Sequence, residues 1–492
     1  MYLTFDVGTT ALKTALYNTE GRRLHRIIKE YRIESPSEGC YEFNPELYWQ
    51  YLLEGFKELL KRSDVNPSEI KSISGCSQGE TVIFLDRDNT PLRPALVWLD
   101  KRASREVEIL QNIFEEETLY RTTGLSEMDT TWSAPKILWV KNNEKNCYER
   151  IDKVMLIEDY LVYRLTGQFV ATPSLWSSSA LFDIRTKQYW SDMVDYLGVS
   201  EKLPKIVPEG SIVGNPIGSV CDLLGLNRKT VVVKGSMDQT LGILGGGNIV
   251  PGIVTETTGT ALAVVSIVEE VSFEKSVKIP FQPHVIDDKY ILLPFAQTAG
   301  IVYKWFRDEF LDTIDYEEYN NLASKVPPGA DGLLLLPFLA GAVYPENDPY
   351  AKGVLYGLTL KHGKAHFIRA IMESIGYLLN KILGVMEDYG VVIEEIRSMG
   401  GGARSDEWLQ IKADICGNSI IRMREEEAPS LGAAILSAVK IGDYPHFQDA
   451  VSKMVNTGKV FSPESQNAHV YTKGYELYCS LIELMKPVFK KY

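Results

Sequence analysis

The chain has 492 residues, of which 45% are hydrophobic and 24% charged, proportions typical of a globular protein with two or three domains. Lysine and arginine total 52 against 65 aspartate and glutamate, which gives a net charge of −13. Because nucleic acids and anionic membranes are bound by basic surfaces, this balance argues against both as partners. It still permits a local basic pocket for a phosphorylated ligand.

Six scattered cysteines without a CxxC pair indicate reduced thiols rather than a disulfide framework or a zinc site. The first residues, Met1 to Asp6, have neither a basic region nor a long apolar stretch, so no signal peptide is expected. The longest apolar segment, 333–344, is broken by Pro337 and Gly341 and is shorter than the roughly 20 residues that span a bilayer. We therefore expect a cytoplasmic protein.

The first half of the chain predicts an α/β domain that starts at the first residue. Alternating apolar residues predict a three-stranded meander, with strands at 2–7, 12–17 and 24–33. Apolar residues at helical spacing predict a helix over 45–60. Further along, we expect strands at 70–75 and 81–85 and mostly helices over 100–200, as in 134–143 and 157–166.

The second half repeats this pattern. A buried-type strand is predicted over 231–235, and the strand–turn–strand pattern of the N-terminus recurs over 253–268. Later segments predict helices at 365–383, 406–416 and 429–439 and strands at 396–399 and 419–423. We interpret this as a duplicated α/β domain, with one copy over 1–246 and the other over 247–492. The alternative is a chance resemblance between two β-hairpins.

The turn Gly8-Thr9-Thr10 follows a strand that ends in Asp6. Glycine and threonine let backbone N–H groups approach phosphate oxygens, and the hydroxyls add donors. Asp6 can hold hydrated Mg²⁺, and Lys13 adds positive charge. A plain hairpin would also explain such a turn.

The turn Thr257-Thr258-Gly259-Thr260 offers the same chemistry from the second half. Two such turns, one from each half, are what binding a triphosphate from both sides would require. Thr258, Gly259 and Thr260 are therefore candidate phosphate-binding residues.

A third glycine-rich segment, Gly400 to Ser405, lies between a predicted strand and a helix whose N-cap is expected at Ser405. Without side chains, Gly401 and Gly402 would let a flat ligand such as adenine lie against the backbone. A plain strand-to-helix turn is the alternative. Neither a Walker A sequence nor GxGxxG occurs, which argues against P-loop and Rossmann sites.

Several polar residues follow β-like segments and could bind a substrate. Asp238 comes shortly after the apolar strand 231–235, where it could accept a proton from a hydroxyl or simply cap a turn. Gln78, Glu80 and Asp100, beside the aromatic Trp98, suit a polyhydroxylated ligand, although surface positions would explain them too. The acidic run 425–427 is expected to be a solvated loop.

These residues resemble the FGGY carbohydrate kinases along essentially the whole chain. The most specific match runs from Gly353-Val354-Leu355-Tyr356-Gly357-Leu358 through His366-Phe367 to Ala370-Ile371-Met372-Glu373, which looks like the C-terminal family signature. Lys136 to Val140 resembles the N-terminal signature, although Thr131 departs from its usual start. The resemblance implies two ribonuclease-H-like domains, of the actin and hexokinase type, with a catalytic cleft between them.

The resemblance also implies roles for the candidate residues, with ATP as donor and Mg²⁺ as metal. Asp238 would be the catalytic base, and Asp6 would orient Mg²⁺ through water. The phosphates would be held by Gly8, Thr9, Thr10, Lys13, Thr258, Gly259 and Thr260, with Gly401 and Gly402 beside adenosine. The sugar pocket would comprise Gln78, Glu80, Trp98, Asp100 and Gln239. Domain closure on the sugar would exclude water, with a hinge near 245–252.

The substrate is less sharply indicated. Segments 92–100 and 133–139 look like those of xylulokinases, but Ser77-Gln78-Gly79 stands where these enzymes carry Met-His-Gly. Glycerol kinases have Gln-Arg-Glu-Thr there, and Gln78, Glu80 and Thr81 match three of these four residues. Asp238-Gln239 also looks like the pair that glycerol kinases carry. Because Gly79 replaces the arginine, we expect extra space and a substrate longer than glycerol.

We therefore predict phosphorylation of a terminal primary hydroxyl of a ketopentose, of the xylulose or ribulose class, in carbohydrate catabolism. A kinase of a small polyol (erythritol, ribitol or glycerol) is the alternative. An actin-like ATPase and a catalytically silent sugar- or nucleotide-binding protein are remoter ones. An aromatic content of 10% is compatible with a homodimer.

Overall fold

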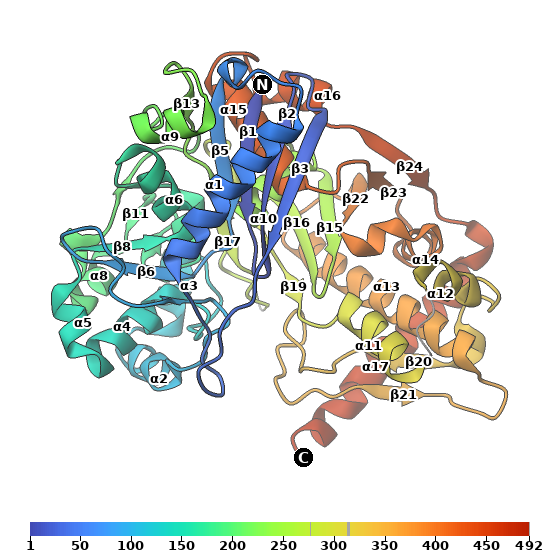
Figure 1. The fold of residues 1–492 in the computed structure, drawn as a ribbon. Helices are drawn as coiled ribbons and strands as arrows, with labels where there is room; N and C mark the ends of the chain where they lie inside the picture. The colour runs from blue at the N-terminus through green and yellow to red at the C-terminus, as the bar shows by residue number, and fades with distance from the viewer. Residues whose placement is uncertain (276, 312–314, 492) are drawn as a thin grey trace.

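The computed structural model describes residues 1–275, 277–311 and 315–491. Two mixed β-sheets, one from each half of the chain, form the centre of the molecule, and helices cover them (Figure 1). The predicted α/β class with two similar domains is thereby confirmed, whereas the boundary at 246–247 stays a prediction. Within the described residues, no helix is both long and apolar enough to cross a membrane.

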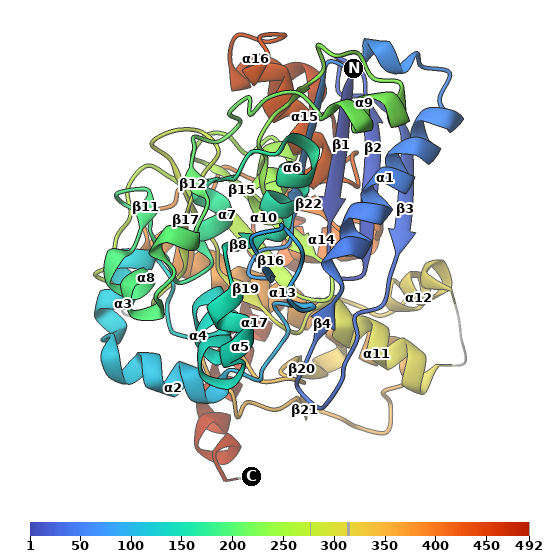
Figure 2. The same cartoon turned by 60° about the vertical axis from the view of Figure 1, so that its left-hand side comes forward.

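The first sheet has the strand order β13-β5-β1-β2-β3, with β14 also pairing with β5. Strand β1 is antiparallel to β2 and parallel to β5, so Asp6 lies beside Lys13 on one side and Cys76 on the other. Helix α1 packs on β2 and β3, as Figure 2 shows. The strands of this sheet are β1 (Tyr2–Val7), β2 (Ala11–Tyr17), β3 (Arg23–Glu30), β5 (Ser72–Ser77), β13 (Val231–Val232) and β14 (Ser236–Met237).

The second sheet has the order β17-β18-β16-β15-β22-β23-β24, with β19 pairing with β16. Strand β15 is antiparallel to β16 and parallel to β22, which is the relation that β1 has to β2 and β5. Strand β15 therefore occupies in the second sheet the place that β1 occupies in the first. The strands are β15 (Ile253–Thr258), β16 (Leu262–Val268), β17 (Phe281–Pro283), β18 (Tyr290–Leu292), β19 (Phe295–Ala296), β22 (Glu395–Met399), β23 (Ile420–Met423) and β24 (Thr457–Phe461).

Helices and small sheets complete both halves. The first half contains α1 (Pro45–Arg62), α2 (Ser104–Ile113), α3 (Glu116–Thr123), α4 (Ser133–Asn143), α5 (Lys145–Arg150), α6 (Ile157–Thr166), α7 (Pro173–Ser177), α8 (Ser191–Leu197), α9 (Gly218–Leu224) and α10 (Asp238–Gly245). The second half contains α11 (Gly300–Phe310), α12 (Tyr316–Ala323), α13 (Lys364–Asp388), α14 (Asp406–Cys416), α15 (Ala428–Lys440), α16 (Phe447–Met454) and α17 (Ala468–Phe489).

The small sheets comprise β4 (Glu42–Phe43), β7 (Ala95–Leu96), β6 (Val82–Leu85) and β8 (Lys153–Leu156), and the pairs β9 (Val170–Ala171) with β12 (Lys205–Ile206), β10 (Phe182–Asp183) with β11 (Gln188–Tyr189), and β20 (Leu334–Leu336) with β21 (Val354–Tyr356).

Helix α15 connects the two halves, because it belongs to the second half but packs against β1, β2 and β5 of the first sheet and against α10. The two helices approach so closely that a Cβ at Gly432 would lie 1.9 Å from the carbonyl oxygen of Leu241. Only glycine allows this distance, and the contact places the first turn of α10, where Asp238 lies, next to the first sheet.

The predicted strand 231–235 is shorter in the structure than expected. Strand β13 ends at Val232, Val233 forms an isolated bridge with Ile212, and β14 begins at Ser236. Lys234 lies between the two strands, and its fully buried ammonium group contacts two carboxylates of α6, Glu158 and Asp159.

Candidate active site

The first predicted phosphate turn, residues 8–10, connects β1 to β2. Lys13 Nζ lies 3.4 Å from Asp6 Oδ2 and 2.8 Å from Oε2 of Glu427, which precedes α15. Asp6 and Glu427 outweigh burial, which alone would lower the pKa of Lys13, and hold that pKa above its usual value. Lys13 is therefore already paired with two carboxylates rather than held out as a free phosphate-binding cation.

The acidic run 425–427 is not the solvated loop that we expected. Glu427 is buried and pairs with Lys13 and with Arg26 of β3, and Glu425 pairs with Arg23. Only Glu426 is exposed. The run links the second half to strands β2 and β3, because three basic residues of those strands face it.

Thr9 lies between the predicted phosphate turn and the predicted sugar pocket. Its hydroxyl donates to Gln78 Oε1 over 2.8 Å and accepts from Trp98 Nε1 over 3.0 Å. Thr81 extends the network, because its hydroxyl accepts from Gln78 Nε2 at 3.3 Å and from the backbone N–H of Trp98 at 3.2 Å. Two predicted pocket residues and one predicted phosphate residue thus form one hydrogen-bonded group.

Glu80 is buried in a backbone conformation with φ of 62°. Burial raises its pKa to about 7, although contact with Ser178 and the charge of Lys136 oppose this. Lys136 is itself fully buried, and burial lowers its pKa to about 8. Its ammonium group donates to the carbonyl oxygens of Thr131 and Trp132.

The space beside Gly79 is not open, contrary to our expectation. A Cβ at this position would lie 2.8 Å from Ser178 Oγ and 3.4 Å from Met237 Cε. Ser178 and Met237 therefore occupy the space next to Gly79, so this residue provides no argument for a longer substrate.

Asp100 lies beside the pocket but is already fully engaged. Its carboxylate accepts from the backbone N–H of Tyr41 at 2.6 Å and pairs with Arg102 at 2.8 Å. Arg102 also pairs with Glu42 at 2.7 Å. These contacts indicate that Asp100 stabilises the loop that follows Trp98.

Asp238 is the first residue of α10 and is half-buried. Burial, with the nearby charges of Asp6 and Glu80, raises its pKa well above the usual value, although the backbone N–H of Gln239 donates to Oδ1 at 2.7 Å. Gln239 itself is exposed. The charges of Asp6 and Glu80 therefore both act on the candidate base.

Asp6 and Asp238 carry carboxylate oxygens, the type of ligand that Mg²⁺ prefers. Burial raises the pKa of Asp6, and Glu427 adds to this while Lys13 opposes it. Because Asp6 also raises the pKa of Asp238, a cation held by Asp6 would reduce the repulsion between the two carboxylates.

The second predicted phosphate turn is stabilised by a buried ion pair. Lys412 Nζ lies 2.8 Å from Glu256 Oε1 and 2.7 Å from Thr258 Oγ1, and Thr258 Oγ1 donates to Glu256 Oε2 at 2.8 Å. Thr258 is buried, whereas Gly259 and Thr260 are exposed. The side chain of Thr258 thus serves the fold, while Gly259 and Thr260 remain exposed to a ligand.

The predicted adenosine segment lies against this second turn. A Cβ at Gly402 would lie 2.7 Å from Thr258 Cβ, so this glycine is required for packing. At Gly401, no heavy atom of the described residues lies within 4 Å of the corresponding position. The expected N-cap is confirmed, because Ser405 Oγ accepts from the backbone N–H of Trp408 at 3.1 Å.

These contacts place the candidate residues in two groups. Asp6, Thr9, Gln78, Glu80, Trp98 and Asp238 gather around the first sheet, and Thr258, Gly400 and Gly402 around the second. Sequence reasoning missed three buried lysines: Lys136, Lys234 and Lys412. Lys412 shares the buried face of α14 with Trp408 and Leu409, and Lys234 interrupts an apolar run. A lysine at a position where the pattern predicts an apolar residue was therefore the signal that could have identified them.

Both halves of the chain match models of one protein family. The N-terminal domain model of the FGGY family of carbohydrate kinases matches residues 1–245, and the C-terminal domain model matches residues 253–441. A xylulose kinase of Staphylococcus epidermidis is 30% identical over 484 residues, which cover 98% of this chain and 97% of that protein.

Two solved structures from Lactobacillus acidophilus are similar over the whole chain. A ligand-bound xylulose kinase has a TM-score of 0.92 at 26% identity and covers 100% of both chains. A gluconate kinase has the same TM-score and identity and covers 100% of this chain and 99% of its own. The two structures carry different substrate names, so similarity at this level leaves the substrate open.

Proposed function

The chain belongs to the FGGY family of carbohydrate kinases, and from this premise we propose that it transfers the γ-phosphoryl group of ATP to a terminal primary hydroxyl of a ketopentose. The substrate class is that of xylulose or ribulose. A relative named xylulose kinase, similar over nearly the whole chain, supports this choice over a small polyol.

In the proposed reaction, Asp238 accepts the proton of the sugar hydroxyl. The hydroxyl oxygen bonds to the γ-phosphorus while the bond from that phosphorus to the β–γ bridging oxygen breaks, and ADP leaves. Such transfers depend on positioning and on stabilising charge at the phosphoryl oxygens. Mg²⁺ would neutralise phosphate charge, held by Asp6 through water. The backbone of the two turns would bind the phosphates, and Gln78 and Trp98 would orient the sugar.

The engagement of the neighbouring cations is the observation that carries the choice of a neutral sugar over a sugar acid such as gluconate. Glu80 and Asp238 are carboxyl groups whose charges repel each other. The neighbouring cations are already bound, Arg102 to Asp100 and Glu42, and Lys136 to two backbone carbonyls. A carboxylate ligand would add a further negative charge without a ready partner, which is costly in a buried site.

The test is ADP release by the purified protein with Mg-ATP and, in turn, D-xylulose, L-xylulose, D- and L-ribulose, erythritol, ribitol, glycerol and D-gluconate. We expect one ketopentose to have the highest kcat/KM, and ³¹P NMR of the product to show a phosphomonoester on a terminal carbon. Gluconate as the best substrate would contradict the argument from charge. A polyol as the best substrate would favour the resemblance of Gln78, Glu80 and Thr81 to glycerol kinases.

A further inference from the structure

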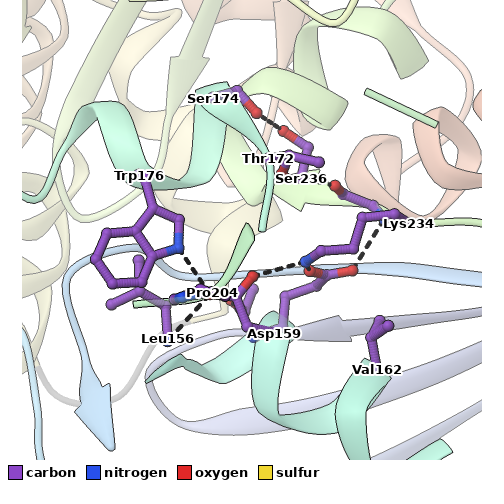
Figure 3. Close-up of polar contacts among 12 residues, drawn as sticks. Leu156, Asp159, Val162, Thr172, Ser174, Trp176, Pro204, Lys234 and Ser236 are labelled. Carbon is purple, nitrogen blue, oxygen red and sulfur yellow. Dashed lines mark hydrogen bonds and ion pairs between the residues drawn. The ribbon is translucent and has the colours of Figure 1, made fainter. Parts of the chain in front are cut away.

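Lys234 lies immediately before the segment that carries Asp238, and its side chain is fully buried. Its ammonium group pairs with Glu158 and lies 2.7 Å from Asp159 Oδ1. Figure 3 shows Asp159 between Lys234 and Trp176, whose Nε1 donates to Asp159 Oδ2 over 2.7 Å. Both carboxylates lie in the first turn of α6, where the helix dipole also favours negative charge.

Glu158 contacts both segments that form the proposed acceptor site. Its Oε1 accepts from the backbone N–H of Gly235 at 2.9 Å, three residues before Asp238. Its own backbone N–H donates to Ser77 Oγ at 3.2 Å, directly before Gln78. Glu158 therefore contacts both the segment 235–238, which carries the candidate base Asp238, and Ser77, which precedes the candidate sugar ligand Gln78.

Further contacts fix the position of the segment that carries Asp238. The Thr172 hydroxyl donates to the carbonyl oxygen of Gly235 at 3.0 Å, and Ser174 and Ser236 are joined through their hydroxyls (Figure 3). A Cβ at Gly235 would lie 1.7 Å from the carbonyl oxygen of Gly75, so the two backbones are in direct contact. In this arrangement, Lys234 is the cation that holds the two α6 carboxylates beneath the site.

A buried cation with two carboxylates is weak evidence of a contribution to stability, because apolar residues of similar volume often replace such groups without loss. What the charged group can provide is a defined geometry, since each carboxylate oxygen is directed to a particular donor. Here, those donors include the backbone of the base segment and Lys234 itself.

We propose that Lys234 is a positioning residue that acts through Glu158 and Asp159. It holds the segment 235–238, which carries Asp238, against Ser77 at the end of β5 and the adjacent Gln78. This inference rests on the proposed function for its kinetic consequence. Its structural part, the connection of the two segments, is independent of which substrate the enzyme uses.

The test compares two double variants with the same change of charge. Lys234→Met with Glu158→Gln removes one cation and one anion, and the glutamine oxygen can still accept from Gly235. Arg369→Met with Glu373→Gln does the same to a buried pair of α13, where Glu373 likewise accepts from the backbone N–H of a glycine, Gly329. The Arg369 variant is the control, because it shows how the loss of a buried ion pair elsewhere affects stability and hydrogen exchange.

Hydrogen exchange followed by mass spectrometry gives the readout that needs no substrate. We expect exchange to rise in peptides covering 76–80 and 234–238 together in the Lys234 variant, and in neither peptide in the Arg369 variant. A rise confined to 234–238, or equal rises in both variants, would overturn the proposal.

Kinetics then test the consequence for catalysis. With the best substrate of the wild-type enzyme, we expect kcat of the Lys234 variant to fall at least tenfold below that of the Arg369 variant, with an unchanged KM for ATP and similar melting temperatures. Equal kcat values in the two variants would overturn the positioning role. If the wild-type enzyme phosphorylates no sugar of the panel, the proposed function fails, and the exchange data alone decide whether the connection exists.

Discussion

The hydroxyl of Thr9 lies 2.8 Å from Oε1 of Gln78, so the loop predicted to bind phosphate is hydrogen-bonded to the loop predicted to bind sugar. The same hydroxyl accepts from Trp98 Nε1. A threonine that would otherwise be counted as a phosphate ligand therefore orients two residues of the acceptor pocket, and occupancy of one subsite can affect the other.

Replacing Thr9 by valine should weaken sugar use. The variant keeps the shape of the side chain but leaves Gln78 Oε1 and Trp98 Nε1 without this partner, which costs about 1–3 kcal/mol. We expect KM for the sugar to rise roughly tenfold. Thr9→Ser, which keeps the hydroxyl, is the control for steady-state kinetics. Equal kinetics of Thr9→Val and Thr9→Ser would contradict the assignment.

Asp238→Asn should remove the proton acceptor while preserving the local structure, because the amide oxygen can still accept from the backbone N–H of Gln239. Loss of a general base lowers rates by about 100- to 10,000-fold. We expect kcat to fall within that range while sugar affinity, measured by calorimetry, stays within a fewfold of wild type. A variant with unchanged kcat would show that Asp238 is not the base.

The pH profile of kcat/KM should have its acidic limb at a higher pH than an ordinary aspartate would give. Asp238 acts as a base only when it is deprotonated, so activity is complete above its pKa and is lost as the pH falls through it. Burial, together with Asp6 and Glu80, raises that pKa above 3.8. Glu80→Gln removes one of these negative charges and should move the limb to lower pH. A wild-type rate that stays constant down to pH ~4 would contradict this prediction.

Gly401→Ala and Gly402→Ala separate ligand contact from packing. A Cβ at Gly401 meets no described atom within 4 Å, so this variant should unfold as the wild type does, and its KM for ATP should rise only if nucleotide lies against the segment. A Cβ at Gly402 would lie 2.7 Å from Thr258, so that variant should lose about 1–3 kcal/mol of stability. Urea unfolding and ATP kinetics of both variants provide the test. An unchanged KM for ATP in Gly401→Ala would argue against the adenosine assignment.

Gly432→Ala should destabilise the contact between α15 and α10. The new methyl group would lie 1.9 Å from the carbonyl oxygen of Leu241, and we expect a loss of about 1–3 kcal/mol, measured by urea unfolding. Gly384→Ala in α13 is the matched control. No described atom lies within 4 Å of its Cβ position, and helix propensity predicts a gain of up to about 1 kcal/mol. Equal stabilities of the two variants would contradict the close contact.

The sequence by itself determined the elements and the repeat. Strands 2–7 and 253–257, the helix 157–166 and the helix 406–416 with its Ser405 cap lie in the structure within a residue of their predicted positions. Periodicity, caps and glycine-rich turns are local, so each can be recognised within a few residues of the chain. The repeated turn motif predicted the duplication. The sequence could therefore also have predicted that β15 pairs with its neighbours as β1 does.

Only the tertiary structure decided which charged residues meet. The pairing of Lys13 with Glu427 joins residues from opposite halves of the chain, and no local pattern distinguishes a buried acidic run from a solvated one. The same is true of Lys234 with Glu158 and Asp159 and of Lys412 with Glu256, whose energies depend on burial and on distances of a few ångströms. The prediction of extra space at Gly79 was wrong for the same reason. Whether a missing side chain leaves space depends on which residues pack around that position, and here Ser178 and Met237 fill it.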